Sequence, residues 1–388
     1  MKVLLFGLEF NIGNLGCEAL AYSFVNILNE LADEMSINIE YKALVYEDKP
    51  TPKIPNTEIE VECVKIRTKK ISFWNYAYKC CEESDLIIDF TMGDSFSDIY
   101  GFKRYFFMTF LKQIACIVKT PFILGPQTYG PFKHLYAKIW SRKIVLKADE
   151  VFSRDEMSAK YLKELTGRSV NITTDVAFAL PSYKSDLIKD NSKIHIGINP
   201  SGLLWHGGYT GNNQFGLTLD YKKYCEDILD YYCKKNEYQV YLIPHVGNPD
   251  EINKIDNDFN VCKILKEKYP DTIFIDGKKS AMEIKGYISE MDIFIGARMH
   301  ATIGAFSSGI ATIPVSYSRK FEGLYDNLNY RYVISASKIC NEEAKKLTIE
   351  YINEYKLLKQ NVDQSLKYVS DMQDNFKNKI KELINVTG

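Results

Sequence analysis

Short, mostly apolar runs alternate with amphipathic segments along most of the chain. Val3–Phe6, Leu86–Phe90 and Asp292–Ile295 are such runs, and each is followed at once by glycine or threonine. Runs of this length are typical of strands buried on both faces of a parallel sheet. Between residues 20 and 31 the apolar residues instead recur at helical spacing. The alternation predicts an α/β fold built on parallel strands.

The alternating pattern falls into two successive series, residues 1–180 and 192–340. A polar stretch between them, Leu180–Lys193, reads as a linker. A chain of 388 residues is also long for one compact domain. We therefore predict two Rossmann-like, doubly wound domains. The lysine- and glutamate-rich segment 341–388 is predicted to be helical and to pack back on the first domain.

Composition and charge limit the classes of protein to which the chain can belong. Hydrophobic residues make up 46% of the chain and charged residues 26%, which is enough to build buried cores. The net charge of −1 argues against bulk binding of nucleic acid. The nine cysteines show no metal-binding spacing, and their odd number suggests reduced thiols in the cytoplasm. We expect no metal, no signal peptide and no membrane-spanning run of about 18 apolar residues.

The richest stretch is 291–325, which reads as strand, helix and strand. Arg298 and His300 lie where the first strand meets the helix, and Arg319 and Lys320 follow the second strand. Ligands of open α/β sheets lie beyond the carboxyl ends of the strands, and cations at a helix N-terminus favour an anion. His300 can also move a proton near neutral pH. The plainer interpretation is that His300 caps the helix and the cations are solvated.

Polar residues also follow other predicted strands. Arg154 comes directly after a short strand, where a guanidinium can grip a carboxylate or phosphate. A salt bridge from Arg154 to Asp155 or Glu156 is the alternative. Further acceptor or cleft candidates lie in strand-end or glycine-rich loops: Asn14, Glu18, Asp94, Ser95, Gln127, Tyr129, His206 and His245. Plain tight turns, helix capping by Asp94 or Ser95 and a structural His245 are the alternatives there.

The segment 134–147 is predicted to be a basic amphipathic helix. It carries Lys138, Arg142, Lys143 and Lys147 among aromatic and aliphatic residues. Such a helix can rest on an anionic membrane surface, here the inner face of the membrane. An ordinary helix with one solvated face has the same pattern, so both interpretations stay open.

The stretch GARMHATIGAFSSGIATIPVSYSRK resembles the C-terminal signature of the polysaccharide pyruvyl transferase family, with its Gly-x-Arg-x-His and its Ser-x-Lys loop. Residues 127–131 are similar to the family's Gln-x-x-Gly-Pro element, and Arg154-Asp155 to its Arg-Asp pair. The chain departs from the family at Glu18, which stands near an expected Asp, and at Met92, which replaces a glycine.

The resemblance implies two doubly wound domains facing a cleft, as in GT-B glycosyltransferases. It implies transfer of pyruvate from phosphoenolpyruvate to a sugar of a cell-surface polysaccharide, such as capsule or exopolysaccharide, or to its lipid-linked precursor, as a ketal. No further cofactor is implied. The first domain would hold the acceptor and the second the donor. His300 would serve as the general acid or base, and the donor-binding cations would be Arg154, Arg298, Arg319 and Lys320.

Two other functions remain open at the level of sequence. A glycosyltransferase with a nucleotide-sugar donor would use the same cations for a diphosphate, with Glu322 as the acid for the ribose hydroxyls. A non-catalytic sugar-binding protein of the same fold is the second alternative. Retention of Arg154, His300 and Lys320 together speaks against it.

Overall fold

The computed structural model describes residues 1–46, 60–251 and 254–387, without the side chains of residues 319, 386 and 387. It divides into two compact units. The first domain consists of Met1–Ile12, Leu20–Ala179 and the chain from Ser370 onward. The second consists of Gly13–Ala19 and Leu180–Val369. The change of domain thus falls between Ala179 and Leu180, and Gly13–Ala19 and residues 341–369 belong with the second domain.

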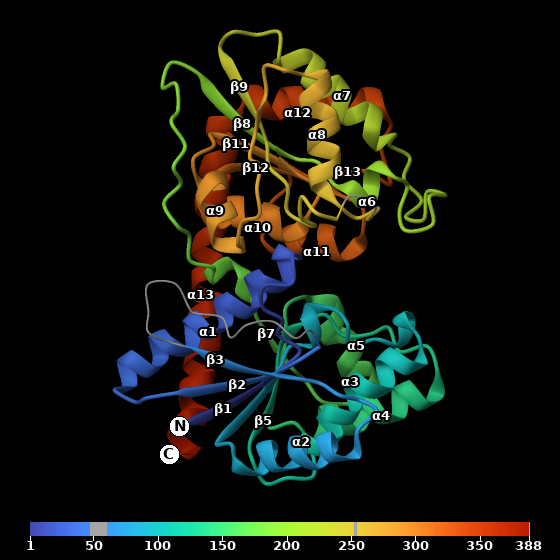
Figure 1. Ribbon diagram of the computed structural model, residues 1–388, viewed down its shortest axis with the longest axis vertical. Helices are drawn as coiled ribbons and strands as arrows, with labels where there is room; N and C mark the ends of the chain where they lie inside the picture. Colours follow the sequence, from blue (N-terminus) through green and yellow to red (C-terminus); the bar gives the residue numbers. More distant parts are fainter. Residues whose placement is uncertain (47–59, 252–253, 388) are drawn as a thin grey trace. The chain divides into compact units, whose positions relative to one another are not determined.

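In the described residues, the first domain contains a fully parallel sheet in the order β3-β2-β1-β4-β5-β6-β7 (Figure 1). Its strands are β1 (Lys2–Phe6), β2 (Glu40–Val45), β3 (Val61–Lys65), β4 (Leu86–Asp89), β5 (Phe122–Gln127), β6 (Glu150–Ser153) and β7 (Asn171–Ile172). Its helices are α1 (Leu15–Met35), α2 (Ile71–Glu83), α3 (Phe102–Ala115), α4 (Leu135–Lys147) and α5 (Glu156–Thr166). The strand order reverses between β1 and β4, which makes the domain doubly wound.

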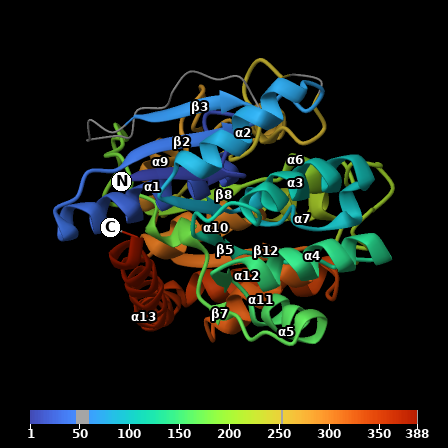
Figure 2. The ribbon, with the colours of Figure 1, turned by 90° about the horizontal axis from the view of Figure 1, so that it is seen from below.

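Helices cover both faces of this sheet. On one face α2, α3, α4 and α5 follow one another side by side (Figure 2). On the other face lie α1 and the end of α13 (Tyr355–Thr387), where Phe376 packs on Phe24 and Phe152. Lys377 and Lys381 of α13 pair with Glu30 and Glu34 of α1. The C-terminal helix thus packs back on the first domain, as predicted.

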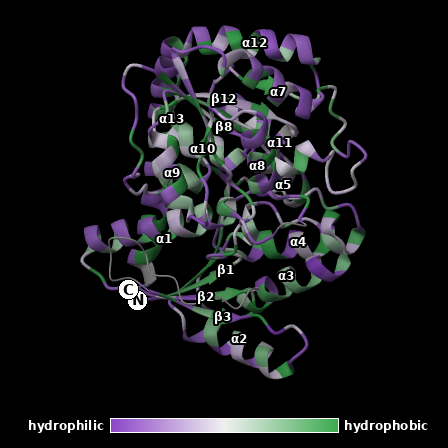
Figure 3. Cartoon of the chain, turned by 45° about the horizontal axis from the view of Figure 1, so that its top comes forward, coloured by the Kyte–Doolittle hydropathy of each residue, from purple (hydrophilic) through white to green (hydrophobic). Residues whose placement is uncertain are grey.

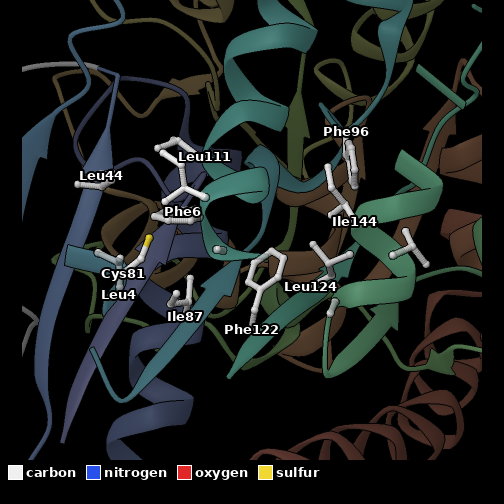
Figure 4. Close-up of a cluster of buried hydrophobic side chains, with 14 of the residues drawn as sticks. Leu4, Phe6, Leu44, Cys81, Ile87, Phe96, Leu111, Phe122, Leu124 and Ile144 are labelled. Atoms are coloured by element: carbon white, nitrogen blue, oxygen red, sulfur yellow. The ribbon is translucent and has the colours of Figure 1, made fainter. Parts of the chain in front are cut away.

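The strands are apolar because they are buried on both faces (Figure 3). Figure 4 shows the core between the first sheet and its helices α2 to α4. The buried side chains drawn there include Leu4, Phe6, Ile87, Phe122 and Leu124 from the strands and Leu111 and Ile144 from α3 and α4. The packing of this core fixes where each strand ends, and so fixes the position of the loop that follows the strand.

The described part of the second domain contains a second fully parallel sheet, in the order β10-β9-β8-β11-β12-β13. Its strands are β8 (Ile194–Asn199), β9 (Tyr238–Leu242), β10 (Ile273–Phe274), β11 (Ile293–Gly296), β12 (Ala311–Ser316) and β13 (Ile334–Ser335). Its helices are α6 (Gly202–Trp205), α7 (Tyr221–Tyr232), α8 (Asp258–Lys268), α9 (Ala281–Ser289), α10 (Met299–Ser307), α11 (Arg319–Asn327) and α12 (Asn341–Asn353). The strand order reverses between β8 and β11.

The predicted strand–helix–strand unit at 291–325 is present as β11, α10 and β12. The helical segment beginning at residue 341 does not all return to the first domain. Its first helix, α12, packs on α7, with the Tyr224 hydroxyl 2.8 Å from the Thr348 hydroxyl. Across the ranges that the structure describes, no helix has the length and apolar character that a membrane span requires.

Candidate functional site

The loops after β8 and β11 meet where the second sheet reverses its strand order. Asn199 ends β8, and its side-chain oxygen accepts a hydrogen bond from the backbone N–H of Arg298 at 3.1 Å. The side-chain amide of Asn199 donates to the carbonyl of Ile243, beyond the end of β9, at 3.0 Å. One asparagine thus ties together the ends of β8 and β9 and the start of α10. In doubly wound sheets this edge is where ligands bind.

Asp258, the first residue of α8, is the buried centre of this edge. Its carboxylate accepts from the Arg298 guanidinium at 2.7 Å and from the Asn199 amide at 3.3 Å. It also accepts from the backbone N–H groups of Gly202, His245 and Val246, at 2.8, 3.1 and 3.0 Å. A carboxylate engaged from so many sides holds the loops after three strands in one arrangement.

Arg298 is buried and paired with two aspartates. Besides Asp258, its guanidinium forms an ion pair with Asp256. Burial alone would lower the pKa of Arg298, but the charges of Asp258 and Asp256 raise it well above its usual value. The interpretation of Arg298 as a solvated cation is therefore wrong. Its contact with a donor stays a prediction, and the observed contacts show that it helps to shape the site.

His300 is the second residue of α10, and the N-terminal glycine loop lies against it. A β-carbon added to Gly16 would come within 2.5 Å of His300 Nδ1, so only glycine fits there without displacement. Asn14 forms an antiparallel bridge with Val246, and the N–H of Gly247 donates to the carbonyl of Gly13 at 3.0 Å. The loop therefore crosses the carboxyl ends of the second sheet.

Two predicted residues of that loop organise the loop itself. The side-chain oxygen of Asn14 accepts from the N–H of Gly16 at 3.1 Å. The buried carboxylate of Glu18 accepts from the N–H of Gly13, also at 3.1 Å. Asn14 and Glu18 are thus brought to the same edge as His300, although they lie far from it in the sequence.

His245 follows β9 and is 5% exposed. Within the described residues neither of its ring nitrogens has a hydrogen-bond partner. Burial lowers the pKa of His245 well below its usual value, and the nearby His300 and Arg298 lower it further, so the imidazole is neutral. An unsatisfied buried polar group is costly, so it calls for a partner such as a water molecule or a ligand. The assignment of His245 to the site stays a prediction.

The start of α11 follows β12. Ser318 caps this helix, accepting from the N–H of Phe321, and Lys320 is the helix's second residue and half-buried. The side chain of Arg319 lies outside what the structure describes. Lys320 therefore sits at a helix N-terminus one strand along the sheet from that of α10. Both helix starts carry the partial positive charge that favours an anion.

In the first domain Arg154 is buried and engaged by Asp175 and Thr128. Its guanidinium lies 2.6 Å from the Asp175 carboxylate and donates to the Thr128 hydroxyl at 3.0 Å. The alternative predicted from sequence, a salt bridge from Arg154 to Asp155 or Glu156, gave the wrong partner. Asp155 instead caps α5, where its carboxylate accepts from the N–H of Ser158. A donor contact by Arg154 stays a prediction.

The other first-domain candidates lie at the carboxyl edge of the first sheet with different exposures. The Tyr129 hydroxyl is buried between the carbonyls of Phe152 and Gly125, at 3.0 and 3.2 Å, and its one O–H can donate to either of them, which indicates a packing role. Ser95 accepts from Arg104 at 2.9 Å, and Asp94 beside it is half-buried. In the second domain His206 ends α6 and is exposed.

Gln127 belongs to a buried polar cluster that sequence reasoning missed. Its amide donates to the Asp89 carbonyl at 3.0 Å, while its side-chain oxygen has no partner in the described residues. Asp89 in turn forms a buried ion pair with Lys112 at 3.0 Å. An aspartate ending an apolar strand and a lysine inside an apolar helix were the available signals for this pair.

The switch point of the first sheet is also strained. Thr91, Met92 and Gly93 follow β4 with φ of 42°, 54° and 80°, all in the left-handed region. A β-carbon on Gly7, after β1, would come within 2.3 Å of the Thr91 nitrogen. Consecutive left-handed residues are costly when one is a threonine, and such strain gathers at functional sites.

A family model described as polysaccharide pyruvyl transferase matches residues 14–319. The chain belongs to this family. The match begins in the glycine loop at Asn14 and ends at the start of α11, so it includes every site residue above except Lys320. No curated protein matches the chain.

Solved structures share the fold of this chain over nearly their whole length. UDP-GlcNAc 2-epimerase from Neisseria meningitidis, bound to UDP-GlcNAc, is 13% identical with a TM-score of 0.55, covering 96% of this chain and 100% of its own. HepE from Anabaena, in complex with UDP-glucose, is 10% identical with a TM-score of 0.55 and full coverage of both chains. The lipopolysaccharide outer core galactosyltransferase WaaB is 12% identical with a TM-score of 0.52, covering 98% and 99%. They confirm the predicted GT-B-like pair of Rossmann-like domains.

The residues named from sequence at 298–300 and 14–18 do come together in one domain. Asp258 and Asn199, which hold them, were not predicted. In the described ranges, no three His, Cys, Asp or Glu side chains are placed to hold a metal ion.

Proposed function

We propose that this chain transfers pyruvate from phosphoenolpyruvate to a sugar of a cell-surface polysaccharide, or of its lipid-linked precursor, in the cytoplasm. The observation that carries the proposal is the placement of His300 at the switch point of the second sheet, next to Gly16 and held by the network around Asp258. Membership of the family supports transfer to a polysaccharide. The donor and the ketal product are part of the proposal.

The proposed reaction needs one acid and a site for phosphate. His300 gives a proton to the methylene carbon of phosphoenolpyruvate, and a sugar hydroxyl bonds to the resulting C2 cation and gives its own proton to the His300 imidazole. A second hydroxyl then attacks C2 as the C2–O bond to phosphate breaks, and its proton goes to the departing phosphate. One phosphoenolpyruvate and one diol become one ketal and one phosphate. The N-terminus of α11 with Lys320 would neutralise the departing phosphate, with Arg319 as a further proposed contact.

The contacts of Arg298 refine its proposed role. Asp256 and Asp258 already compensate the charge of Arg298. We therefore propose that Arg298 mainly holds the start of α10 in place and contributes little as a free cation to donor binding. The helix amides and His300 would then face the donor from a fixed position.

The contacts of Glu322 weigh against a nucleotide-sugar donor. The Ser335 hydroxyl donates to its carboxylate, and Lys338 forms an ion pair with it at 2.6 Å. An acid engaged in this way is poorly placed to bind ribose hydroxyls. Glu322 was the residue proposed for that role, so its contacts favour phosphoenolpyruvate.

The test of the proposed function is phosphate release from phosphoenolpyruvate in the presence of a panel of soluble glycans. We expect release only with an acceptor, and a glycan product whose mass has grown by one ketal-linked pyruvate. Ile188→Ser, which changes an exposed isoleucine of the second domain, is the control and should behave as the unchanged protein. Transfer of a sugar from a UDP-sugar to the same panel, with phosphoenolpyruvate inert, would contradict the proposal.

Lys320→Ala should raise the KM for phosphoenolpyruvate at least as much as it lowers kcat. The lysine would contact the phosphate in the ground state as well as in the transition state, and a charge-assisted hydrogen bond contributes about 1.5–3 kcal/mol. Steady-state kinetics over a range of donor concentrations measures the split. Lys338→Ala removes an equal charge from an exposed side chain and should leave the KM unchanged. An unaltered KM in Lys320→Ala would remove Lys320 from the donor site.

Gly16→Ala should lower kcat by up to about 10²-fold, because the added methyl group displaces the His300 imidazole. Gly323→Ala is the matched control. A β-carbon there meets nothing within 4 Å, so activity and fold should be kept. Circular dichroism would establish that both variants are folded. Full activity in Gly16→Ala would show that the position of His300 does not matter.

A further inference from the structure

One outer surface of the first domain carries many exposed apolar side chains. They lie on α2, α3 and α4 and just after the end of α3, on the sides that face away from the sheet. Its exposed apolar members are Ile71, Phe102, Phe110, Ile117, Leu135, Ile139 and Leu146, with Leu135 73% and Phe102 56% exposed. We call this patch, with the aromatic rings beside it, the aromatic face. Large exposed apolar patches mark interaction sites.

Ring contacts show that the aromatic face is continuous across the three helices. Trp74 of α2 packs on Phe110 of α3, with ring centroids 4.6 Å apart. On α3, Phe106 lies 5.8 Å from Phe110 and 5.8 Å from Phe102. Phe102 reaches Tyr136 of α4 at 5.3 Å. The rings form one array, so the exposed residues act on a partner together.

The part of the aromatic face on α3 and α4 carries charge of a single sign, whereas α2 carries the exposed Glu82 and Glu83 beside Lys79. Residues 99–148 contain nine lysines and arginines and not one aspartate or glutamate, although acids make up 50 of the 388 residues of the chain. Lys112 is buried against Asp89, and the other eight are exposed: Lys103, Arg104, Lys119, Lys133, Lys138, Arg142, Lys143 and Lys147. In a chain whose net charge is −1, this is a strongly basic surface.

We propose that the aromatic face docks the protein on the surface of an anionic lipid bilayer. Aromatic and aliphatic side chains insert at the level of the headgroups, and the surrounding lysines and arginines attract the anionic lipids. Stable attachment without a membrane-spanning helix needs both an apolar and an electrostatic contribution, and this face supplies both. Trp and Tyr are also the rings that prefer the boundary between membrane and water.

The aromatic face lies near the candidate acceptor residues of its own domain. Helices that follow strands of a parallel sheet begin at the carboxyl edge of the sheet. Phe102 and Leu135 stand at the starts of α3 and α4, and Asp94 and Ser95 follow β4 at the same edge. A saccharide on a membrane lipid would then reach the domain from the docked side. The choice of a lipid-linked acceptor rests on the proposed function, whereas membrane docking itself does not.

The test is sedimentation of the full chain with vesicles, without any substrate. One set contains phosphatidylcholine with phosphatidylglycerol, and the other phosphatidylcholine alone. We expect binding to the anionic vesicles that is at least about tenfold stronger than to the neutral ones and weakens as salt is raised above about 0.1 M. Leu135→Ser/Ile139→Ser should reduce binding about tenfold or more by removing the inserting side chains. Arg142→Gln/Lys143→Gln should reduce it and flatten the salt dependence.

Ile188→Ser/Ile264→Ser is the matched control, since it removes two exposed isoleucines from the second domain and should not change binding. Thermal unfolding would establish that every variant is folded. Absence of binding to anionic vesicles would overturn the proposal, as would equal loss in the control. A further outcome is that the parent chain forms a homo-oligomer, does not bind vesicles, and loses the oligomer in Leu135→Ser/Ile139→Ser. That outcome would overturn the proposal and assign the aromatic face to association between copies of the chain. Transfer to a soluble glycan is measured separately, so failure of docking and failure of the proposed function can be told apart.

Discussion

Replacing His300 by alanine should lower kcat about 10²–10⁴-fold while phosphoenolpyruvate binding is largely kept. The reason is that proton transfer to the methylene carbon is needed in the transition state, whereas the donor's charges are met by other groups. His300 is positioned for this by Gly16 on one side and by the N-terminus of α10, which Asn199 holds. Steady-state kinetics gives kcat, and calorimetry of the donor without acceptor gives its affinity.

His245 is the histidine with which His300 must be compared. It is buried, neutral and near His300, but we expect its role to be mostly structural, so His245→Ala should keep most of kcat in the folded fraction. If His300→Ala turned over normally while His245→Ala was inactive, the two roles would have to be exchanged. The ring nitrogens of His245, which have no hydrogen-bond partner among the described residues, would then be the groups that transfer the proton.

Asp258→Ala should destabilise the second domain by about 3–5 kcal/mol, the cost of breaking a buried ion pair on one side. The change leaves the buried Arg298 guanidinium without one of its two carboxylate partners. It also leaves the backbone N–H groups of Gly202, His245 and Val246 without their acceptor. Urea unfolding followed by circular dichroism measures the loss. Activity should fall with it, because the start of α10 loses its anchor.

Asp256→Ala is the control for Asp258. Asp256 pairs with the same guanidinium but is half-buried, so water can replace it and the loss of stability should be clearly smaller. Equal losses in the two variants would mean that Asp258 acts only as a charge partner of Arg298. A loss under about 1 kcal/mol in Asp258→Ala would contradict its central place in the site.

The fold was readable from the sequence because its signal is local. The apolar run before Gly296 and the small residues of 301–305 each indicate one element within a few positions. The parallel sheets follow from the alternation of such elements. The two Rossmann-like domains were therefore predicted from the pattern, and their GT-B-like architecture from the family resemblance, while the membership of Gly13–Ala19 in the second domain was not predicted. No local pattern shows that a loop near the N-terminus packs against His300.

The network around Asp258 was missed for a related reason. An aspartate at a helix start looks in sequence like an ordinary cap, and its partners Asn199 and Arg298 lie 59 and 40 positions away. Only the folded sheet brings these residues to one edge. Tyr129 lies at a variable position of the family's Gln-x-x-Gly-Pro element, and its buried hydroxyl contacts the backbone carbonyls of Gly125 and Phe152.

Calorimetric titration of the chain with phosphoenolpyruvate and, separately, with UDP-sugars tests the central claim most directly, because it asks which donor is bound and needs no acceptor. We predict that phosphoenolpyruvate binds, that Lys320→Ala weakens this binding while Lys338→Ala does not, and that UDP-sugars give no heat beyond dilution. Binding of a UDP-sugar that Lys320→Ala weakens, with no binding of phosphoenolpyruvate, would contradict the account.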